Sequence, residues 1–327
     1  MENTLNAEAT EVDLDARIRC SEWSRVTSLS PAGTAGTYPG YLLVELPLPW
    51  PRDVGETPEA AALAPLLAST GYRLQAVVPS DPAAPPAERR VILHARTPGQ
   101  QWFAGYRRFE RPVGASLPEA VAELLAAAAE PGPSGLEAPG VDVLVCGHGT
   151  RDSCCGRMGA GLTARLGAVA APDGVTIWRT SHMGGHRFAA TFLLLPEGTS
   201  WAYGDVELVE TVLRRKGDFD AVAGYYRGCS GLDGPQAQAL EGEVARQVGW
   251  SLLDSPRTST FDGSRAGLTC VYDGETVTWS AQVGKGRAVS MPDCQSPPSS
   301  ATKTQSEWAV SAITRDQHLP SPDGGTT

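Results

Sequence analysis

The sequence predicts an α/β fold, because short apolar runs alternate with segments in which apolar residues recur at helical spacing. The alternation is clearest from residue 141 onward. There the pattern predicts strands at 141–146, 175–180, 190–195 and 201–203, and helices at about 154–169 and 206–216. Gly217 supplies the stop signal for the last helix. A strand, a helix, three further strands and a closing helix follow the order of a thioredoxin-like domain.

The N-terminal half repeats this order. Apolar runs predict strands at 41–45, 74–78, 91–95 and 102–106, and helices at 59–69 and 118–127. A stretch rich in Pro and Gly at 131–140 has the composition of a linker. We therefore expect an N-terminal extension at 1–17, an α/β domain without ligands at 18–130, the linker, and a thioredoxin-like domain at 141–220.

The C-terminal part predicts a smaller unit followed by a tail. Residues 221–294 should contain a helix at 235–248 and a β-hairpin that turns at Asp273 and Gly274, and this unit should pack on the preceding domain. From 295 to 327 Ser, Thr, Pro and Gly dominate, so we expect this tail to be disordered unless a partner orders it.

Composition limits the class of protein. The chain has 327 residues, 41% hydrophobic and 20% charged, which is enough for a buried core and two domains. The sequence has no apolar run of membrane-span length and no signal-peptide pattern, so we expect a soluble, cytoplasmic protein without membrane association. A formal charge of -10 disfavours nucleic acid and favours a partner with a basic docking patch.

The seven cysteines are an odd number and are sparse outside one cluster, which argues against a secreted disulfide framework. The sequence therefore predicts that Cys20, Cys229, Cys270 and Cys294 are thiols or small buried residues.

The most informative feature is a pair of short cassettes, CGHGTRDSCCGR at 146–157 and SHMGGHRF at 181–188. They hold three of the seven cysteines and three of the five histidines. Soft and borderline ligands gathered so closely indicate a metal. The first cassette follows an apolar strand and precedes a helix, and at such a turn backbone N–H groups and the helix dipole stabilise thiolates and an anionic cluster.

Ligand number and spacing distinguish three kinds of metal centre. A closed zinc site uses short C-x2–4-C and H-x3–5-H pairs. The histidines of the second cassette fit, but the cysteines at 146 and 155 are too far apart and those at 154 and 155 too close. A Rieske centre needs two Cys-His boxes. Cys146 and His148 resemble the first box, but no cysteine stands three positions before either histidine of the second cassette.

The third kind is the 2Fe-2S cluster of a thioredoxin-like ferredoxin, whose cysteines form one widely spaced pair and one C-x3-C pair. Here Cys146 and Cys155 have the wide spacing, and an H-x3-H pair stands in place of C-x3-C. With these motifs, and with stretches around Cys20, 33–37, 42–47 and 49–51, residues 18–250 resemble the sucrase/ferredoxin-like family, which is related to fungal actin-patch-distal-type proteins. The resemblance implies a non-Rieske 2Fe-2S cluster held by two Cys and two His. The family's name does not establish sugar hydrolysis.

Adjacent helical side chains diverge by about 100 degrees, so Cys154 and Cys155 cannot easily both bind one iron. The family pattern favours Cys155, with Cys154 as the alternative. The implied metal and cofactor ligands are thus Cys146, Cys155, His182 and His186. A lone Cys at a strand end is more often a core residue and a His pair on a loop more often a surface feature, but the pairing of the cassettes favours ligation. Gly184 and Gly185 add to this, since glycine lets the backbone approach a cluster.

Five further residues surround the expected ligands: His148, Arg151, Asp152, Arg157 and Arg187. For His148 we expect a structural hydrogen bond rather than a bond to iron. The charged residues form either a solvated salt-bridge network or a set that offsets the charge of the cluster, and both interpretations can hold together. Asp152 is also placed to cap the helix that begins near Cys154.

These features predict a one-electron carrier with proton-coupled reduction rather than a stand-alone enzyme. Neutral imidazoles in place of thiolates should raise the potential, and the free nitrogen of each imidazole should bind a proton more readily once the cluster is reduced. The expected donor is a separate flavin-dependent NAD(P)H reductase, since no Gly-rich dinucleotide fingerprint follows a strand, and the acceptor protein is unspecified. Two alternatives stay open: an oxidoreductase whose cluster feeds a substrate pocket between the two domains, and an iron-sulfur redox sensor or interaction module.

Overall fold

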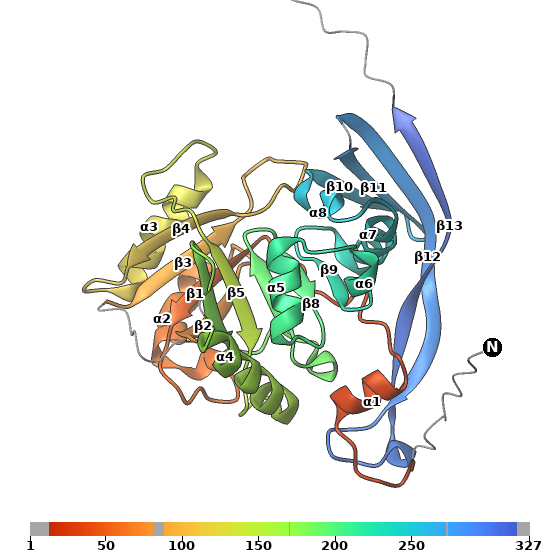
Figure 1. Ribbon diagram of the computed structural model, residues 1–327. Coiled ribbons are helices and arrows are strands. Elements are labelled where there is room, and N and C mark those ends of the chain that lie inside the picture. Colours follow the sequence, from red (N-terminus) through yellow and green to blue (C-terminus); the bar gives the residue numbers. More distant parts are fainter. Residues whose placement is uncertain (1–12, 81–87, 170, 273, 319–327) are drawn as a thin grey trace, which may run out of the picture.

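The computed structural model describes residues 13–80, 88–169, 171–272 and 274–318. It shows two layered α/β halves joined through one curled sheet, with a second, smaller sheet along one side (Figure 1). The larger sheet has nine strands in the order β4-β3-β1-β2-β6-β5-β7-β8-β9.

The N-terminal half contains β1, η1, α2, β2, β3, β4 and α3 in chain order. Their bounds are Gly40–Glu45, Val54–Glu56, Pro58–Leu67, Arg73–Pro79, Arg90–Ala95, Arg107–Pro112 and Leu117–Ala129. The short helix α1, Cys20–Val26, precedes them and was not expected. Alternate residues of β1 and β3, such as Leu42 and Leu93, pack with Val121 and Leu124 of α3, because successive strand residues face opposite sides of a sheet.

The second half repeats this arrangement with β5, η2, α4, β6, η3, β7, β8 and α5. Their bounds are Val141–Cys146, Cys155–Gly159, Ala160–Gly167, Val175–Thr180, His186–Phe188, Phe192–Leu195, Thr199–Trp201 and Val206–Arg214. In each half the first two strands pair in parallel and the third pairs antiparallel to the first. The first half thus has the order β2-β1-β3-β4 and the second β6-β5-β7-β8, which confirms the predicted α/β fold with a repeated thioredoxin-like order.

The halves meet where β2 and β6 pair antiparallel, with Val77 opposite Thr180. The curl of the sheet also brings β3 and β4 to the start of β5. There the buried Asp142 accepts hydrogen bonds from His94 Nε2 at 2.8 Å, from Arg108 Nε at 2.7 Å and from Trp178 Nε1 at 2.8 Å. Strands of both halves therefore share one buried polar network.

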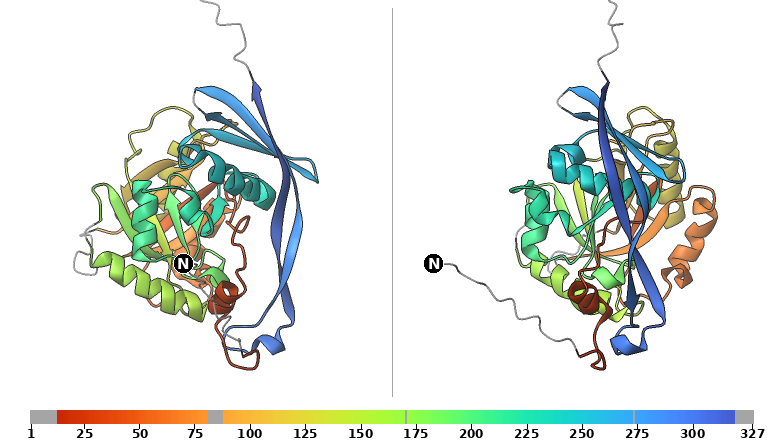
Figure 2. Two further views of the ribbon diagram at one scale, coloured as in Figure 1. Left: turned by 45° about the vertical axis from the view of Figure 1, so that its right-hand side comes forward. Right: turned by 90° about the vertical axis from the view of Figure 1, so that its right-hand side faces the viewer.

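The C-terminal part contains α6, β9, α7, α8, β10, β11, β12, η4 and β13. Their bounds are Asp220–Ala223, Tyr226–Cys229, Gly234–Val248, Ser251–Asp254, Arg257–Phe261, Arg265–Tyr272, Glu275–Met291, Pro298–Ser300 and Lys303–His318. The predicted helix is α7, and β11 and β12 form the predicted hairpin with Tyr272 opposite Glu275, although Asp273 lies outside the described residues. Figure 2 shows the long strands β12 and β13 running side by side past α7 to the region of α1.

Two expectations were wrong. Residues 102–106 do not form a strand. The fourth strand of the first half is β4, whose sequence RRFERP is mostly charged and so lacks the apolar pattern that predicts a strand. The tail is not disordered throughout, because Lys303–His318 forms β13 along β12. A strand of polar residues can be stable when a long partner strand satisfies its backbone hydrogen bonds.

Candidate metal centre

The two cassettes meet at one edge of the sheet because β5 and β6 are parallel. Cys146 is the last residue of β5, and His182 follows the end of β6 by two residues. The carboxyl ends of neighbouring parallel strands lie at the same edge, which is a common place for a functional site in an α/β sheet. In the first half the corresponding end of β1 runs into LPLPW at 46–50, which has no Cys or His.

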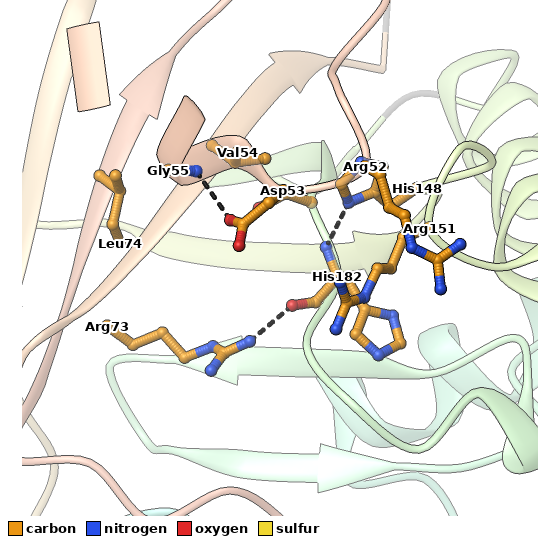
Figure 3. Close-up of a pocket in the computed structure, with 10 residues that line it drawn as sticks. Arg52, Asp53, Val54, Gly55, Arg73, Leu74, His148, Arg151 and His182 are labelled. Carbon is orange, nitrogen blue, oxygen red and sulfur yellow. Dashed lines mark hydrogen bonds between the residues drawn. The ribbon is translucent and has the colours of Figure 1, made fainter. Parts of the chain in front are cut away.

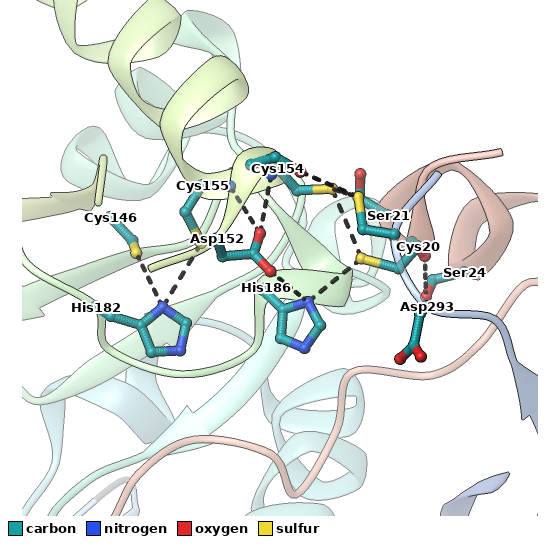
Figure 4. Close-up of polar contacts among 12 residues, drawn as sticks. Cys20, Ser21, Ser24, Cys146, Asp152, Cys154, Cys155, His182, His186 and Asp293 are labelled. Atoms are coloured by element: carbon teal, nitrogen blue, oxygen red, sulfur yellow. Dashed lines mark hydrogen bonds and ion pairs between the residues drawn. The ribbon is translucent and has the colours of Figure 1, made fainter. Parts of the chain in front are cut away.

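Cys146, Cys155 and His182 converge at this edge. One potential metal-ligating atom of each residue lies within 4.8 Å of those of the other two, and Nδ1 of His182 is 3.8 Å from both sulfur atoms. Both cysteines are fully buried, whereas His182 is partly exposed. Figure 4 shows the two sulfur atoms facing the same ring nitrogen. These three of the four predicted ligands can therefore hold one metal centre together.

The cysteine pair holds one negative charge more readily than two. The pKa of Cys146 lies well below its usual range because Cys155 donates a hydrogen bond to its sulfur, and His182 adds to this against the effect of burial. The same hydrogen bond, with burial, raises the pKa of Cys155. A buried thiolate beside a second thiol and an imidazole is a ready ligand for a soft or borderline cation.

His186, the fourth predicted ligand, lies beside this group rather than within it. Its ring centre is 6.4 Å from that of His182. Nδ1 of His186 is 3.1 Å from Oδ2 of Asp152 and 3.3 Å from Sγ of Cys20, so this nitrogen faces away from the other three ligands (Figure 4). Nε2 has no hydrogen-bond partner among the described residues. Metal-bound histidines commonly use one nitrogen for the metal and donate the other to a carboxylate, as His186 would here with Asp152.

Asp152 has two roles at once. Its Oδ1 accepts hydrogen bonds from the backbone N–H groups of Cys154 and Cys155 at 2.9 and 3.2 Å, so it caps the helical turn that carries both cysteines. Burial would raise the pKa of Asp152, but the hydrogen bonds from His186 and from the capped backbone hold it below its usual value.

The turn that Asp152 caps separates the adjacent cysteines. It continues as the π-helical turn η2 and then as α4. Cys155 faces Cys146 and His182, whereas Cys154 faces Cys20 and Cys294, each within a separate group of three potential ligands. A side chain at Gly159 would put its Cβ 1.7 Å from the carbonyl oxygen of Cys146, so only glycine lets this turn approach β5 so closely.

His148 uses both of its ring nitrogens in hydrogen bonds. Nε2 donates to the carbonyl of Pro51 at 2.8 Å. Nδ1 accepts from the backbone N–H of His182 at 3.2 Å, as Figure 3 shows. Burial lowers the pKa of His148, which favours the neutral ring that this pair of bonds requires. His148 therefore positions the second cassette, and neither of its nitrogens is left for a metal.

The three predicted arginines lie in different surroundings. Arg157 is exposed, and Arg187 donates to Gln305 of β13. Arg151 lines a surface cavity of about 370 Å³ beside His182. This cavity lies between the two halves and is lined by Arg52, Asp53, Val54, Gly55, Arg73, Leu74, His148, Arg151, Ser181 and His182 (Figure 3). Arg73 also donates to the carbonyl of His182 at 2.7 Å.

Arg227 of β9 is the cation best suited to balance the negative charge of the cysteine pair. It was not predicted from the sequence. It is 3% exposed, and its guanidinium donates to Thr34 and to the carbonyl of Gly184. Within the described residues no carboxylate forms an ion pair with it. Burial lowers the pKa of Arg227 to about 10, and the neighbouring Cys146 and Cys155 oppose that effect. A buried cation is costly unless an anion compensates it, so Arg227 and the cysteine pair together fit an anionic metal centre.

Arg227 also explains one glycine of the second cassette. Gly185 has φ +79°, and a Cβ there would lie 2.5 Å from the guanidinium. Gly185 is therefore required for the approach of Arg227. The one signal for Arg227 in the sequence is its position between aromatic and small residues in YYRGC at 225–229.

The comparisons with known proteins gave one family match. The family described as Sucrase/ferredoxin-like matches residues 31–228, which include both cassettes and Arg227. Comparison with curated proteins and with solved structures gave no match. Among the described residues, no helix is both long and apolar enough to cross a membrane.

Proposed function

The chain belongs to the sucrase/ferredoxin-like family, and from this and the geometry of its centre we propose that it carries single electrons through a 2Fe-2S cluster held by Cys146, Cys155, His182 and His186. The observation that carries the proposal is the convergence of two buried cysteines and His182 within 4.8 Å, near Arg227, which has no carboxylate partner among the described residues. A bound 2Fe-2S cluster would supply a reversible one-electron couple.

The residues around the centre have distinct tasks in this proposal. Cys146 and Cys155 supply thiolates from the buried side. His182 and His186 supply neutral nitrogens on the partly exposed side, where a partner could come close enough to exchange an electron. Arg227 would stabilise the negative charge added on reduction, because its own charge is buried and Coulomb interactions are strong there.

Proton uptake would accompany reduction at His182 rather than at His186. Nδ1 of His186 is 3.1 Å from Asp152, so this carboxylate would hold a proton there in both redox states. Nδ1 of His182 faces the two sulfurs, so a metal bound there would leave Nε2 as the nitrogen that gives up its proton in the oxidised state and takes it back on reduction. Electrons would come from a flavin-dependent NAD(P)H reductase and pass to an acceptor protein.

The test is the metal content and spectrum of the full-length protein purified without oxygen. We expect a reddish-brown protein with about two irons and two acid-labile sulfides per chain, as a 2Fe-2S cluster requires. Reduction should give the EPR signal of a one-electron-reduced cluster. A colourless protein without iron, after purification and after reconstitution with iron and sulfide, would refute the proposal.

The cavity beside His182 favours one second candidate. Its volume of about 370 Å³ lies in the range of small-molecule sites, and Arg52, Arg73 and Arg151 suit an anionic ligand. The protein would then be an oxidoreductase whose cluster exchanges electrons with a small anionic substrate. Reoxidation of the reduced protein that depends on such a substrate would support this candidate, whereas turnover with a reductase and a protein acceptor alone would support the carrier.

A further inference from the structure

A second group of sulfur atoms lies next to the proposed cluster site. Cys20 begins α1, Cys154 precedes η2, and Cys294 follows β12. Sγ of Cys154 is 3.6 Å from Sγ of Cys20 and 3.2 Å from Sγ of Cys294, and all three sulfur atoms lie within 4.8 Å of one another. The three residues come from distant parts of the chain, so their convergence is a property of the tertiary fold.

These distances agree with the spacing of ligands around one metal ion. Two sulfur ligands of a tetrahedral zinc site with Zn–S bonds of about 2.3 Å lie about 3.8 Å apart. Three thiolates with one further ligand are a common zinc donor set. Soft sulfur ligands also select Zn²⁺ over Mg²⁺ or Ca²⁺.

Simple packing of small apolar side chains explains the group less well. Cys154 is fully buried and Cys20 is 2% exposed. Cys154 has both other sulfur atoms as close neighbours, with Sγ of Cys20 at 3.6 Å and Sγ of Cys294 at 3.2 Å. A thiol is only a weak hydrogen-bond donor and acceptor, so contacts among three thiols give little reason for their convergence from distant parts of the chain. A soft cation would take all three sulfur atoms as ligands at once.

We propose that Cys20, Cys154 and Cys294 form a second metal site, which binds Zn²⁺ and is separate from the centre formed by Cys146, Cys155 and His182. Cys294 is partly exposed, so solvent can reach the fourth coordination position. Nδ1 of His186 lies 3.3 Å from Sγ of Cys20, but it also faces Asp152. The three sulfur atoms alone define the site.

Zinc here would fasten two distant segments, the start of α1 and the connection between β12 and β13, to the helical turn that carries Cys154 and Cys155. The backbone already joins these two segments, because Ile18 donates to Ser296 at 3.4 Å and Gln295 donates to Ile18 at 3.0 Å. A bound metal would add three strong bonds to this weak contact. The metal would also hold Cys20 and α1 against His186. The proposed cluster needs His186 to stay in position as a ligand.

The first experiment measures zinc and iron in the full-length protein and in single variants. We expect about one zinc per chain in the wild type, as one site requires. Cys20→Ser and Cys294→Ser should each lose at least about tenfold in zinc occupancy. Cys294→Ser should also keep its iron, whereas Cys20→Ser is judged by zinc alone because Cys20 also contacts His186. The adjacent pair gives the sharpest contrast: Cys154→Ser should lose zinc and keep iron, and Cys155→Ser should do the reverse. Cys270→Ser, a buried free cysteine of β11, is the matched control and should keep both metals.

A second experiment keeps the inference testable if a single variant fails to fold. The full-length Cys146→Ser/Cys155→Ser variant, stripped of metal, is titrated with Co²⁺ and then with Zn²⁺. Near-ultraviolet thiolate-to-cobalt absorption that saturates at one equivalent, disappears when Zn²⁺ is added, and is absent when Cys294→Ser is also present would support the site.

Three results would overturn the inference. One is a wild type that holds no zinc and binds none in the cobalt competition. Another is zinc that stays in Cys20→Ser and Cys294→Ser. The third is a disulfide within the group, seen as two fewer thiols in the denatured, unreduced protein. These results are distinguishable from failure of the proposed cluster, because that failure would appear in iron and sulfide content. Iron that follows Cys20 and Cys294 instead of Cys146 and Cys155 would contradict both.

Discussion

Asp152 offers a sharp test, because one side chain both caps a helical turn and contacts a proposed ligand. Two variants separate these roles. Asp152→Ala removes both. Asp152→Asn keeps one carbonyl oxygen, and Asn is as good an N-cap as Asp. When that oxygen caps the turn, however, the amide nitrogen faces Nδ1 of His186. The amide N–H and the Nδ1–H of His186 are both hydrogen-bond donors, so the contact to His186 is lost.

The structure sets the expected magnitudes. Two backbone hydrogen bonds of 2.9 and 3.2 Å make up the cap, and loss of such a cap costs about 1 kcal/mol. The contact of 3.1 Å to His186 orients a proposed ligand, and loss of such a contact typically weakens metal binding about 10- to 100-fold. That loss corresponds to about 1.4 to 2.8 kcal/mol of binding free energy.

Two measurements separate the effects. Denaturant unfolding of the metal-free protein measures what the cap contributes to the free energy of unfolding. The rate at which a chelator bleaches the visible spectrum measures how firmly the cluster is held. Asp152→Asn should unfold like wild type but bleach at least about tenfold faster. Asp152→Ala should also lose about 1 kcal/mol of unfolding free energy.

Asp205 provides the matched control, since it caps α5 by accepting from the backbone N–H of Leu208 at 2.8 Å. Asp205→Ala should lose a similar unfolding free energy without faster bleaching. If Asp152→Asn bleaches as slowly as wild type, Asp152 acts only as a cap and does not support His186. If Asp205→Ala is destabilised and Asp152→Ala is not, the cap at Cys154 and Cys155 contributes nothing.

Four further predictions concern the adjacent cysteines, Arg227, His182 and the buried Asp142. Cys155→Ser should abolish the visible spectrum and Cys154→Ser should retain it; the opposite pattern would exchange their roles. Arg227→Met should lower the midpoint potential, because a buried positive charge near the cysteines is lost; redox titration of a folded variant with an unchanged potential would contradict this. The wild-type potential should fall by up to about 59 mV per pH unit, and His182→Cys should remove that slope; a flat wild-type profile would show that no proton accompanies reduction. Asp142→Asn should lose about 3 kcal/mol at pH 7 because it breaks a buried pair with Arg108. Burial would raise the pKa of Asp142, but His94 and Arg108 lower it below normal, so the stability it contributes is present above about pH 3.9 and lost as pH falls below that value. Asp142→Asn should therefore lose this part of the acid dependence, and acid unfolding curves of unchanged shape would contradict the assignment.

The repeated order of strands and helices could be predicted from the sequence, because each element carries its own local pattern. Strands β1, β3 and β5 are mainly apolar runs, β6 is rich in β-branched and aromatic residues, and α5 has apolar residues at helical spacing. The predictions failed where partners far away in the chain decide the structure. The strand β4 is rich in charge, but its backbone pairs with β3, and β13 is stabilised by the long partner β12. In neither strand does the spacing of apolar residues indicate the strand with which it pairs.

The sequence by itself determined the local part of the site. Cys146, Cys155, His182 and His186 lie in two short motifs at the ends of adjacent strands, and the order of those strands follows from local patterning. Only the tertiary structure decided which groups surround them. It turned Cys155 and Cys154 to different groups of ligands, and it brought Arg227 beside the cysteine pair. It also brought Cys20 and Cys294 to Cys154, over separations of 134 and 140 residues. The physical reason is that spacing within a motif is fixed by a few backbone angles, whereas contacts over such separations depend on how the whole chain packs.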